Sequence, residues 1–503
     1  MPRSQLSMWK TLFQQQPSQE PTLQGRLRTM VVRAILDGVL APGTVLPSSR
    51  ELSALLGISR NTVTLVYQHL ADQAYIEAKP RSGYQVCVNV APKPEVKGAE
   101  RSKLNAPNWA QRLPRKLWAL PNIRKPTNWQ DYPYPFIYGQ FDTSLFPARE
   151  WRECVTQALR ATAVRDWACD RIDQDDARLI EQVQQRILPA RGIWASQDEI
   201  LITAGAQQAN FILAEVLLSG NTVLGLEEPG YPDVRNIYSS HGATIKPLKL
   251  DAHGMDLGSD FRGCDYLYVT PSHQCPTTIA MPEHRRTALL DMARRHDFVV
   301  IEDDYDSELN FDSEPSRALK SLDRDGRVIY VGSLSKTIAP GLRVGFMVAD
   351  PALIREARAS RRLMMRHPPT NNERALALFL SLGHHDMLIR RLTKSYDHRL
   401  ALLGDAVRRY MPLWEFEPPK GGSAMWMQGP TGTQADALAV AALDAGVVIE
   451  SGSIFFSKPK GAHAQRHVRL GVASIHESQI TDGVRLLADT CKRMGHDRAR
   501  WAN

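Results

Sequence analysis

The chain has 503 residues, of which 43% are hydrophobic and 23% charged, a balance that is ordinary for a soluble globular protein and excludes a low-complexity one. Because a single hydrophobic core stops growing near about 250–300 residues, this length predicts two or more domains. The net charge of +8 is uneven: residues 1–130 hold 18 Lys and Arg against 7 Asp and Glu, and residues 131–503 hold 44 against 47. The N-terminal quarter is therefore either a basic surface or the part that meets a polyanion.

Residues 1–21 form an N-terminal extension that is polar, rich in Gln and without clear periodicity. It lacks the apolar core and small-residue cleavage site of a signal peptide. No run of about 18 apolar residues occurs in the chain, so we expect a cytoplasmic protein with no membrane partner. The six cysteines include no CxxC pair, which argues against a disulfide framework and against a metal site.

Residues 22–88 predict a winged helix-turn-helix, the plan of three helices followed by a hairpin. Ser48 and Glu51 have the spacing of a capping box, and Gly57 has the place of a residue that ends a helix. The predicted elements are helices near 22–37, 49–56 and 60–73 and strands at 74–77 and 84–88.

In such a domain the second of the paired helices enters the major groove of DNA with its first side chains at the base edges. Here that helix begins with Arg60, which can bind a guanine through two hydrogen bonds, and Asn61, which can do the same with an adenine. The alternative is that the Ser, Thr and Asn side chains only cap helices. The candidate DNA-binding residues are Ser49, Arg50, Ser59, Arg60, Asn61, Thr62, Thr64, Arg81 and Gly83.

Residues 89–135 are proline-rich and basic with little periodicity, and they predict a linker. Across residues 136–503, apolar strand-like runs alternate with helical patterns, which is typical of a mostly parallel α/β sheet covered by helices. The predicted strands are 200–203, 222–226, 266–270, 298–301, 328–331 and 344–348.

Lys336 lies in a loop of small residues that follows one of these strands, VGSLSKTIAPGLR (331–343). A lysine in such a loop can form a Schiff base with an aldehyde cofactor, and Ser333 and Arg343 are suited to a phosphate. Alone, this pattern is more typical of a surface lysine in a polar loop.

Three further clusters carry polar residues at the ends of predicted strands. In VVIEDDY (299–305), strand alternation puts Asp303 and Tyr305 on one face, where they suit a pyridine nitrogen and a ring oxygen. Glu302 and Asp304 are then expected to face caps or solvent. Ala206 and Gln207 begin a helix after a glycine turn and can hold the phosphate through backbone N–H groups. Arg469, on a short strand near the C-terminus, can bind an acid group.

Together these sequence motifs resemble those of known protein families. ILDGVLAPGTVLPSSRELSALLGISRNTVTLVYQHLADQAYIEAKPRSGYQV (35–86) is similar to the GntR family, and the four clusters resemble fold-type-I pyridoxal-phosphate enzymes of the aspartate aminotransferase group. The whole chain resembles the MocR subfamily of GntR regulators. The motifs typical of that subfamily are EEPGYPDVR (227–235), TPSHQCPT (270–277), IEDDYDSE (301–308) and VGSLSKTIAPGLRVG (331–345).

The resemblance implies a winged-helix domain fused, over residues 136–503, to an aminotransferase-like α/β domain with a small C-terminal α+β subdomain. It implies that pyridoxal 5′-phosphate forms the internal aldimine with Lys336 and pairs with Asp303 and Tyr305. Tyr231 would lie beside the cofactor. Ser333 and Arg343 would hold the phosphate, and Arg469 would meet the effector's acid group.

By the same resemblance the protein is a regulator, not an enzyme, that binds operator DNA as a homodimer with domains exchanged between subunits. It would sense a small amine by forming an external aldimine. Two alternatives stay open: an active aminotransferase with a fused DNA module, and a regulator that senses the cofactor itself.

Two positions depart from the family pattern. Cys275 stands where Phe or Tyr is usual, and Thr278 where Gly is common, and the resemblance places both near the cofactor and the effector. A roomier and more polar pocket is compatible with taurine, an ectoine-derived diamino acid or γ-aminobutyrate.

Overall fold

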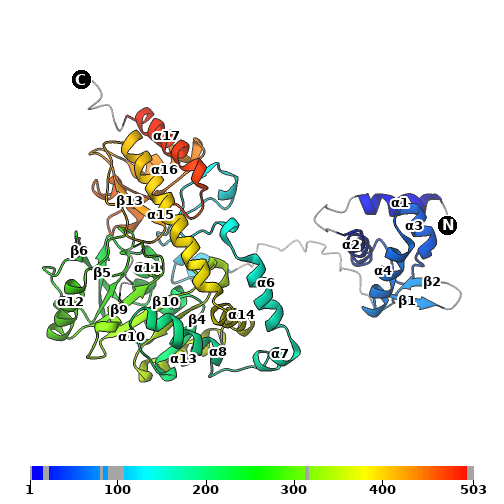
Figure 1. Ribbon diagram of the computed structural model, residues 1–503, viewed down its shortest axis with the longest axis horizontal. Helices are drawn as coiled ribbons and strands as arrows, with labels where there is room; N and C mark the ends of the chain where they lie inside the picture. Colours follow the sequence, from blue (N-terminus) through cyan, green and yellow to red (C-terminus); the bar gives the residue numbers. More distant parts are fainter. Residues whose placement is uncertain (1–2, 15–21, 80–82, 89–106, 312–316, 496–503) are drawn as a thin grey trace. The chain divides into compact units, whose positions relative to one another are not determined.

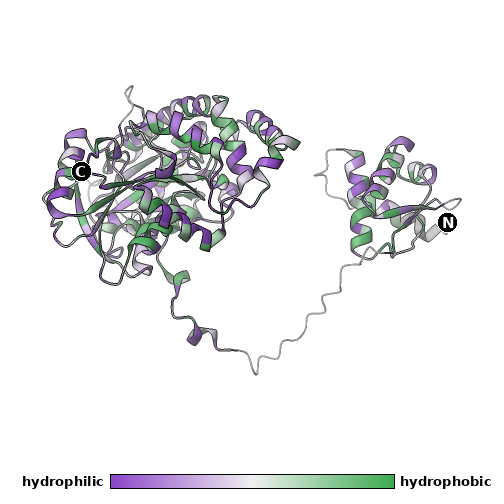
Figure 2. Cartoon of the chain, turned by 90° about the horizontal axis from the view of Figure 1, so that it is seen from below, coloured by the Kyte–Doolittle hydropathy of each residue, from purple (hydrophilic) through white to green (hydrophobic). Residues whose placement is uncertain are grey.

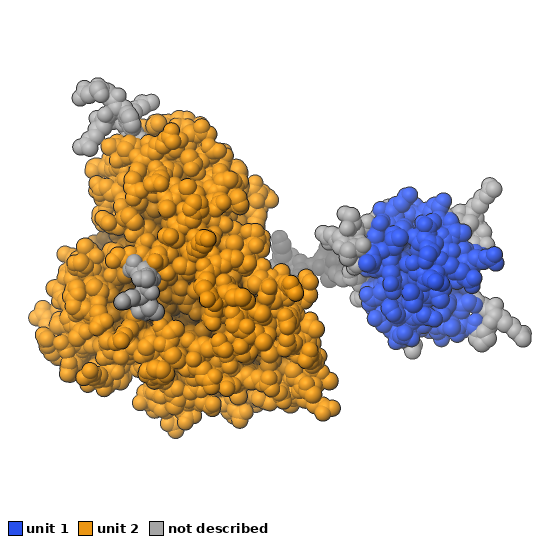
Figure 3. Space-filling model, in the orientation of Figure 1, with its two compact units in different colours: residues 1–114 blue, residues 115–503 orange. Residues whose placement is uncertain are grey.

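The computed structural model describes residues 3–14, 22–79, 83–88, 107–311 and 317–495. The chain forms two compact units, residues 1–114 and 115–503 (Figure 3). Within the described residues, no helix is both long and apolar enough to cross a membrane.

Among the described residues up to 88, the first unit has four helices and a hairpin (Figure 1). Ser48 and Glu51 form the predicted capping box, and Gly57 ends its helix in the left-handed conformation. Ser59 caps the next helix by accepting the backbone N–H of Thr62. The elements are α1 (Arg3–Gln14), α2 (Leu23–Leu36), α3 (Ser49–Leu56), α4 (Arg60–Asp72), β1 (Ile76–Lys79) and β2 (Gly83–Val86).

Two details of this unit differ from the sequence-based expectation. The extension contains a helix, α1, whose Trp9 is 2% exposed and packs into the core of the unit with Leu12 and Phe13. These three residues have helical spacing, but the surrounding Gln residues obscured it. The first strand starts two residues later than predicted because Ala74 adopts a positive φ of 57° and closes the turn after α4.

The second unit is built on an eight-stranded sheet with the order β4-β11-β10-β9-β8-β5-β6-β7. Neighbours from β10 to β6 are parallel, whereas β11 runs antiparallel to both of its neighbours, so the predicted mostly parallel sheet is confirmed. Only β6 and the short β7 had no predicted counterpart. The strands are β4 (Ile200–Thr203), β5 (Val223–Glu228), β6 (Thr244–Asp251), β7 (Gly254–Met255), β8 (Tyr266–Val269), β9 (Val299–Asp304), β10 (Val328–Ser333) and β11 (Gly345–Val348).

Helices cover this sheet and turn their apolar sides toward it, while hydrophilic residues face outward (Figure 2). The helices nearest the sheet in sequence are α10 (Ala206–Leu217), α11 (Pro232–Ser240), α12 (Glu283–His296) and α13 (Pro351–Met365). Further helices lie before and after it: α6 (Ala148–Ala158), α7 (Ala161–Trp167), α8 (Ala177–Gln182), α9 (Leu188–Ala190) and α14 (Thr370–Ser381).

A smaller C-terminal part has a second sheet, with the order β12-β13-β16-β15. The long helix α15 (His384–Tyr410) runs from the large sheet to this part, as Figure 1 shows, so the predicted α+β subdomain is present. Its elements are β12 (Glu415–Phe416), β13 (Ala424–Gln428), α16 (Ala435–Asp444), β14 (Val447–Val448), β15 (Glu450–Ser451), β16 (His467–Gly471) and α17 (Glu477–Arg493).

The predicted linker, 89–135, extends too far toward the C-terminus. From residue 115 the chain belongs to the second unit, and β3 (Tyr134–Pro135) pairs with β14. A short helix, α5 (Trp109–Arg112), precedes this stretch. Proline-rich composition does not distinguish a linker from an irregular segment that packs against a domain, because neither shows periodicity.

Candidate functional site

A cavity of about 300 Å³ in the second unit collects most of the predicted site residues. Thr278 is not among the described residues that line it: it has a positive φ of 64° and its backbone N–H donates to Gln274 in a turn. The predicted residues that do line the cavity are Ala206, Gln207, Tyr231, Cys275, Asp303, Tyr305, Ser333, Lys336, Arg343 and Arg469.

Lys336 is presented by the loop that follows β10. Ser335 fixes this loop, since its hydroxyl donates to the Val344 carbonyl at 3.0 Å and accepts the Val344 N–H at 2.7 Å. The Lys336 ammonium lies 4.9 Å from the centre of the Tyr138 ring. Burial lowers the pKa of Lys336, and the nearby cations Lys125 and Arg469 lower it further. A lower pKa makes the neutral, nucleophilic amine more accessible.

Asp303, at the end of β9, is held by two buried side chains. Its Oδ2 accepts from the Tyr268 hydroxyl at 2.5 Å and from Asn210 Nδ2 at 3.1 Å. Its Oδ1 is buried and has no hydrogen-bond partner among the described residues, and burial raises the pKa of this carboxyl to about 6. A protonated ring nitrogen would supply the missing donor, so the carboxylate fits a pyridinium cofactor.

Another group of residues in the cavity lining is suited to a phosphate. Gly205 has a φ of 83°, and a Cβ built on it would lie 2.7 Å from Arg343 Nη2. Glycine therefore lets the Arg343 guanidinium approach the start of α10, where Ala206 and Gln207 present backbone N–H groups. Arg343 donates to the Ala204 carbonyl at 3.0 Å, and Ser333 lines the same cavity.

Tyr305 and Tyr231 also line the cavity. The Tyr305 hydroxyl donates to the His273 carbonyl at 2.9 Å, and its ring meets Tyr138 edge-on at 6.4 Å. The Tyr231 hydroxyl donates to Asp233 at 3.1 Å. Asp233 also lines the cavity, so a carboxylate that sequence reasoning did not single out belongs to the site.

Arg469 already has an acidic partner within the chain. Its Nε and Nη2 atoms each lie 2.7 Å from Glu450 Oε2, and both side chains are buried. The guanidinium also lies over the Tyr138 and Phe455 rings, at 4.3 and 4.6 Å from their centres. An external acid group would therefore meet a guanidinium that Glu450 holds in place.

Glu302 and Asp304 do not line this cavity, as predicted, and both are buried. Glu302 caps the short helix Lys320–Leu322, as expected, whereas Asp304 faces neither a cap nor solvent but a buried arginine. Glu302 accepts the backbone N–H groups of Leu319 and Lys320 at 2.7 and 2.8 Å. Asp304 pairs with Arg191 at 2.9 Å and accepts from the Tyr330 hydroxyl at 2.7 Å. The strand end is buried on both sides, which the period-2 pattern alone does not indicate.

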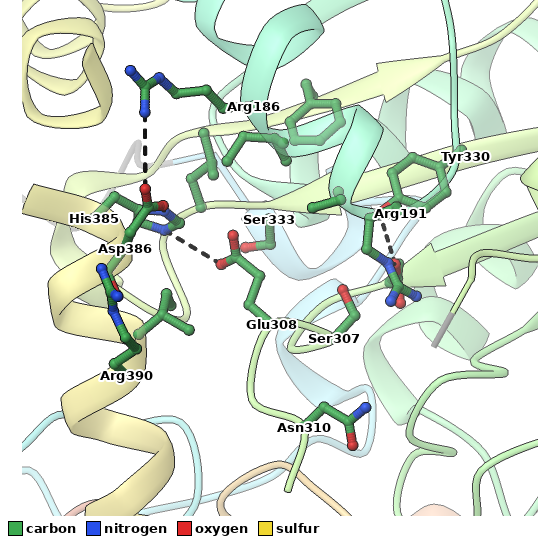
Figure 4. Close-up of a pocket in the computed structure, with 17 residues that line it drawn as sticks. Arg186, Arg191, Ser307, Glu308, Asn310, Tyr330, Ser333, His385, Asp386 and Arg390 are labelled. Atoms are coloured by element: carbon green, nitrogen blue, oxygen red, sulfur yellow. Dashed lines mark hydrogen bonds and ion pairs between the residues drawn. The ribbon is translucent and has the colours of Figure 1, made fainter. Parts of the chain in front are cut away.

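Asp304 and Arg191 line a second cavity of about 350 Å³, which shares Ser333 with the first. Figure 4 shows that its charged side chains point toward one another. Arg191 pairs with Asp304, His385 lies 3.4 Å from Glu308, and Arg186 lies 3.8 Å from Asp386. Its acids thus have basic partners, and none of the described residues that line it is a lysine.

Sequence reasoning missed Asn210, Tyr268, Lys125, Tyr138 and Glu450 as site residues. Asn210 gave a detectable signal, since it is a polar residue on the buried side of an apolar helix. The others gave none, because Lys125 and Tyr138 lie in or just after the proline-rich segment and Glu450 follows an ordinary apolar run.

In the first unit, Arg50, Arg60 and Asn61 are exposed at the starts of α3 and α4. Arg60 Nε donates to the Ser49 hydroxyl at 3.4 Å, which keeps the two helix starts together. Ser59 and Thr62 take part in capping, and the Thr64 hydroxyl donates to the Arg60 carbonyl at 3.0 Å. Gly83, with a φ of 80°, begins β2, and Arg81 lies outside the described residues.

Both units match known families. Residues 23–86 match the family of bacterial regulatory proteins called gntR, and residues 173–487 match aminotransferase class I and II.

Whole regulators are similar as well. The HTH-type transcriptional regulator TauR of Rhodobacter capsulatus is 38% identical over 472 residues, which cover 94% of this chain and 97% of that protein. The probable rhizopine catabolism regulatory protein MocR of Rhizobium meliloti is 32% identical and covers 76% of each chain.

Among solved structures, the α-aminoadipate aminotransferase LysN of Thermus thermophilus, in complex with N-(5'-phosphopyridoxyl)-L-leucine, is similar to this chain. The two are 27% identical with a TM-score of 0.67, over 77% of this chain and 99% of LysN.

Proposed function

Because the chain belongs to the MocR subfamily of GntR-type transcription regulators, with a DNA-binding unit and an aminotransferase-like unit for pyridoxal 5′-phosphate, we propose that it senses a small amine carrying an acid group. The observation that carries this proposal is the convergence of Lys336, the unpartnered Asp303 oxygen and the cation Arg469 on one cavity. When bound, the cofactor supplies an aldehyde that condenses with primary amines.

The residues then have distinct tasks. Lys336 would hold the cofactor, Asp303 would keep its ring nitrogen protonated, and Tyr305 would orient its ring. Ser333, Arg343 and the start of α10 would hold the phosphate, and Tyr231 would form one wall. Arg469 would bind the effector's acid group.

Three effectors fit this description: taurine, an ectoine-derived diamino acid and γ-aminobutyrate. Cys275 supports a polar pocket, because its sulfur lies in the cavity 4.0 Å from Arg469 Nη1 where an aromatic ring would fill the space. Asp233 favours the diamino acid, since a carboxylate in the cavity can pair with a second ammonium group.

A visible absorption titration of the cofactor-loaded protein tests the proposal, with taurine, γ-aminobutyrate, 2,4-diaminobutyrate and D-alanine as probes. A lasting spectral shift without product identifies a sensor and its effector. Loss of the cofactor's absorption band, with a new amino acid accumulating after a keto acid is added, would instead favour an active aminotransferase. The residues for that reaction, a Schiff-base lysine, a carboxylate for the ring nitrogen and an arginine, are all present. A change in DNA binding on cofactor addition alone would favour a cofactor sensor.

We also propose that the protein acts on operator DNA as a homodimer with exchanged domains. The exposed positions of Arg50, Arg60 and Asn61 support a role of the α3 and α4 starts in DNA contact. Gly83 and Arg81 would contribute from the hairpin.

We expect Arg60→Ala and Asn61→Ala each to weaken operator binding by about 1–3 kcal/mol, because each removes a side chain suited to a two-bond base contact. Fluorescence anisotropy with promoter DNA measures the change. Arg33→Ala is the matched control, since Arg33 is exposed on α2 and its loss changes the net charge as Arg60→Ala does. Equal weakening by Arg33→Ala and Arg60→Ala would show a general charge effect and contradict base contact at residue 60.

A further inference from the structure

The segment that follows the DNA-binding unit forms one wall of the cavity. Ile123 and Lys125 line it, only a short stretch after the unit boundary at residue 114. Asn236 Nδ2, on α11, donates to the Pro121 carbonyl at 2.6 Å and holds the segment against this helix. A change inside the cavity can therefore reach this part of the chain through direct contact.

Lys125 lies near Arg469 in the cavity lining, because both cations contact Glu450. Its ammonium donates to the Tyr138 carbonyl and lies 3.2 Å from Glu450 Oε1, while the other Glu450 oxygen binds Arg469. One carboxylate thus serves two cations. An ammonium group has three donors, so the two contacts of Lys125 leave one N–H for a further acceptor.

The space next to Lys125 is kept open by a glycine. Gly139 has a φ of 72°, and a Cβ built there would lie 3.7 Å from the Lys125 nitrogen and 3.4 Å from the Lys336 nitrogen. The two lysines therefore border the same small space, which a side chain at residue 139 would occupy. An amine that reaches Lys336 brings its own substituents close to Lys125.

We propose that Lys125, together with Arg469, binds the acid group of the effector, and that Lys125 transmits this binding to the segment leading to the DNA-binding unit. This inference rests on the proposed function. Lys125 and Arg469 share the single carboxylate of Glu450, and a carboxylate or sulfonate on the effector would give them a second anionic partner. Of these two cations, Lys125 is the one that lies in the segment leading to the DNA-binding unit. Ligand control requires contacts that differ between bound and unbound states, and a change of partner at Lys125 provides one.

The first test compares two amines of similar size on the full-length, cofactor-loaded protein: taurine, which has an acid group, and 2-aminoethanol, which has none. Visible absorption gives both dissociation constants. We expect Lys125→Met to weaken taurine binding about tenfold or more relative to 2-aminoethanol binding, because only taurine loses a charged hydrogen bond, whereas any change at Lys336 affects both amines. Lys116→Met, an exposed lysine of the same segment, is the matched control.

The second readout is the factor by which saturating taurine changes the affinity for promoter DNA, measured by anisotropy. We expect this factor to fall toward unity in Lys125→Met, even at taurine concentrations that compensate for weaker binding, and to be retained in Lys116→Met. Unchanged taurine affinity, or equal weakening of both amines, would overturn acid-group recognition by Lys125. An unchanged factor would overturn its role in transmission. If the wild-type protein responds to no probe amine, the proposed function itself fails, and this inference fails with it.

Discussion

Lys336→Ala is expected to abolish covalent attachment of the cofactor while leaving the fold intact. After loading, borohydride reduction and desalting, the wild-type protein should retain the cofactor on the peptide that contains residue 336, and the variant should retain none. The fold should tolerate the change, because Lys336 stands next to the cations Lys125 and Arg469 and its removal relieves their repulsion. Equilibrium unfolding of the cofactor-free proteins measures this second expectation.

Lys394→Ala, an exposed lysine on α15, is the control and should behave as the wild type does. The informative alternative is attachment at Lys125, which is the other lysine among the described residues that line the cavity. Peptide mass spectrometry distinguishes the two lysines. Cofactor found on Lys125 in the wild-type protein would contradict the assignment of Lys336 as the Schiff-base lysine. It would also contradict the proposal that Lys125 binds the effector's acid group.

The part of the site that follows strands could be predicted from the sequence. Asp303 and Lys336 come at the ends of the neighbouring parallel strands β9 and β10, and parallel strands deliver their C-terminal ends to one edge of a sheet. Arg343 and the start of α10 meet at the same edge because β11 lies between β10 and β4. Local patterns of strand, small-residue loop and helix were sufficient to locate these residues.

The partners of these residues could not be predicted in the same way. Glu450 meets Lys125 across more than 300 residues of sequence, and no local period relates them. Asn210 and Tyr268 look like ordinary residues of a helix and a strand until the fold brings both to Asp303. The sequence therefore predicted Arg469 as an effector contact but not its partner Glu450 within the chain. It predicted a linker but not that Lys125 within it reaches the cavity.

The largest effect on stability is expected from Arg191→Met. Arg191 is 5% exposed and neutralises Asp304, next to Glu302 on the buried end of β9. Although burial opposes ionisation, Arg191 holds the pKa of Asp304 below its usual value. Removing the guanidinium leaves a buried carboxylate without its cation, which should lower the free energy of unfolding by about 3–5 kcal/mol. Urea titration at equilibrium measures this loss.

The loss should depend on pH in a defined direction. In the wild-type protein the lowered pKa of Asp304 contributes stability above the unfolded value of 3.8, whereas in Arg191→Met the unpaired carboxyl is expected to have a raised pKa. The folded variant then binds more protons than its unfolded chain. The difference in the free energy of unfolding between the wild-type protein and Arg191→Met should therefore grow as the pH rises above about 4. A deficit that stays constant from pH 5 to pH 8 would contradict this account.

A second substitution separates the unpaired charge from simple loss of packing. Asp304→Asn added to Arg191→Met removes the buried charge, so the double variant should be more stable than Arg191→Met at pH 8, since losing both ions costs less than stranding one. Arg262→Met is the exposed counterpart, because Arg262 also lies 2.9 Å from an aspartate, Asp260, yet its side chain is 83% exposed. We expect a cost there of less than about 1 kcal/mol. Because Asp304 is adjacent to Asp303, Arg191→Met should also weaken cofactor binding, whereas Arg262→Met should not. A stable Arg191→Met protein with normal cofactor affinity would show that the ion pair does not position Asp303.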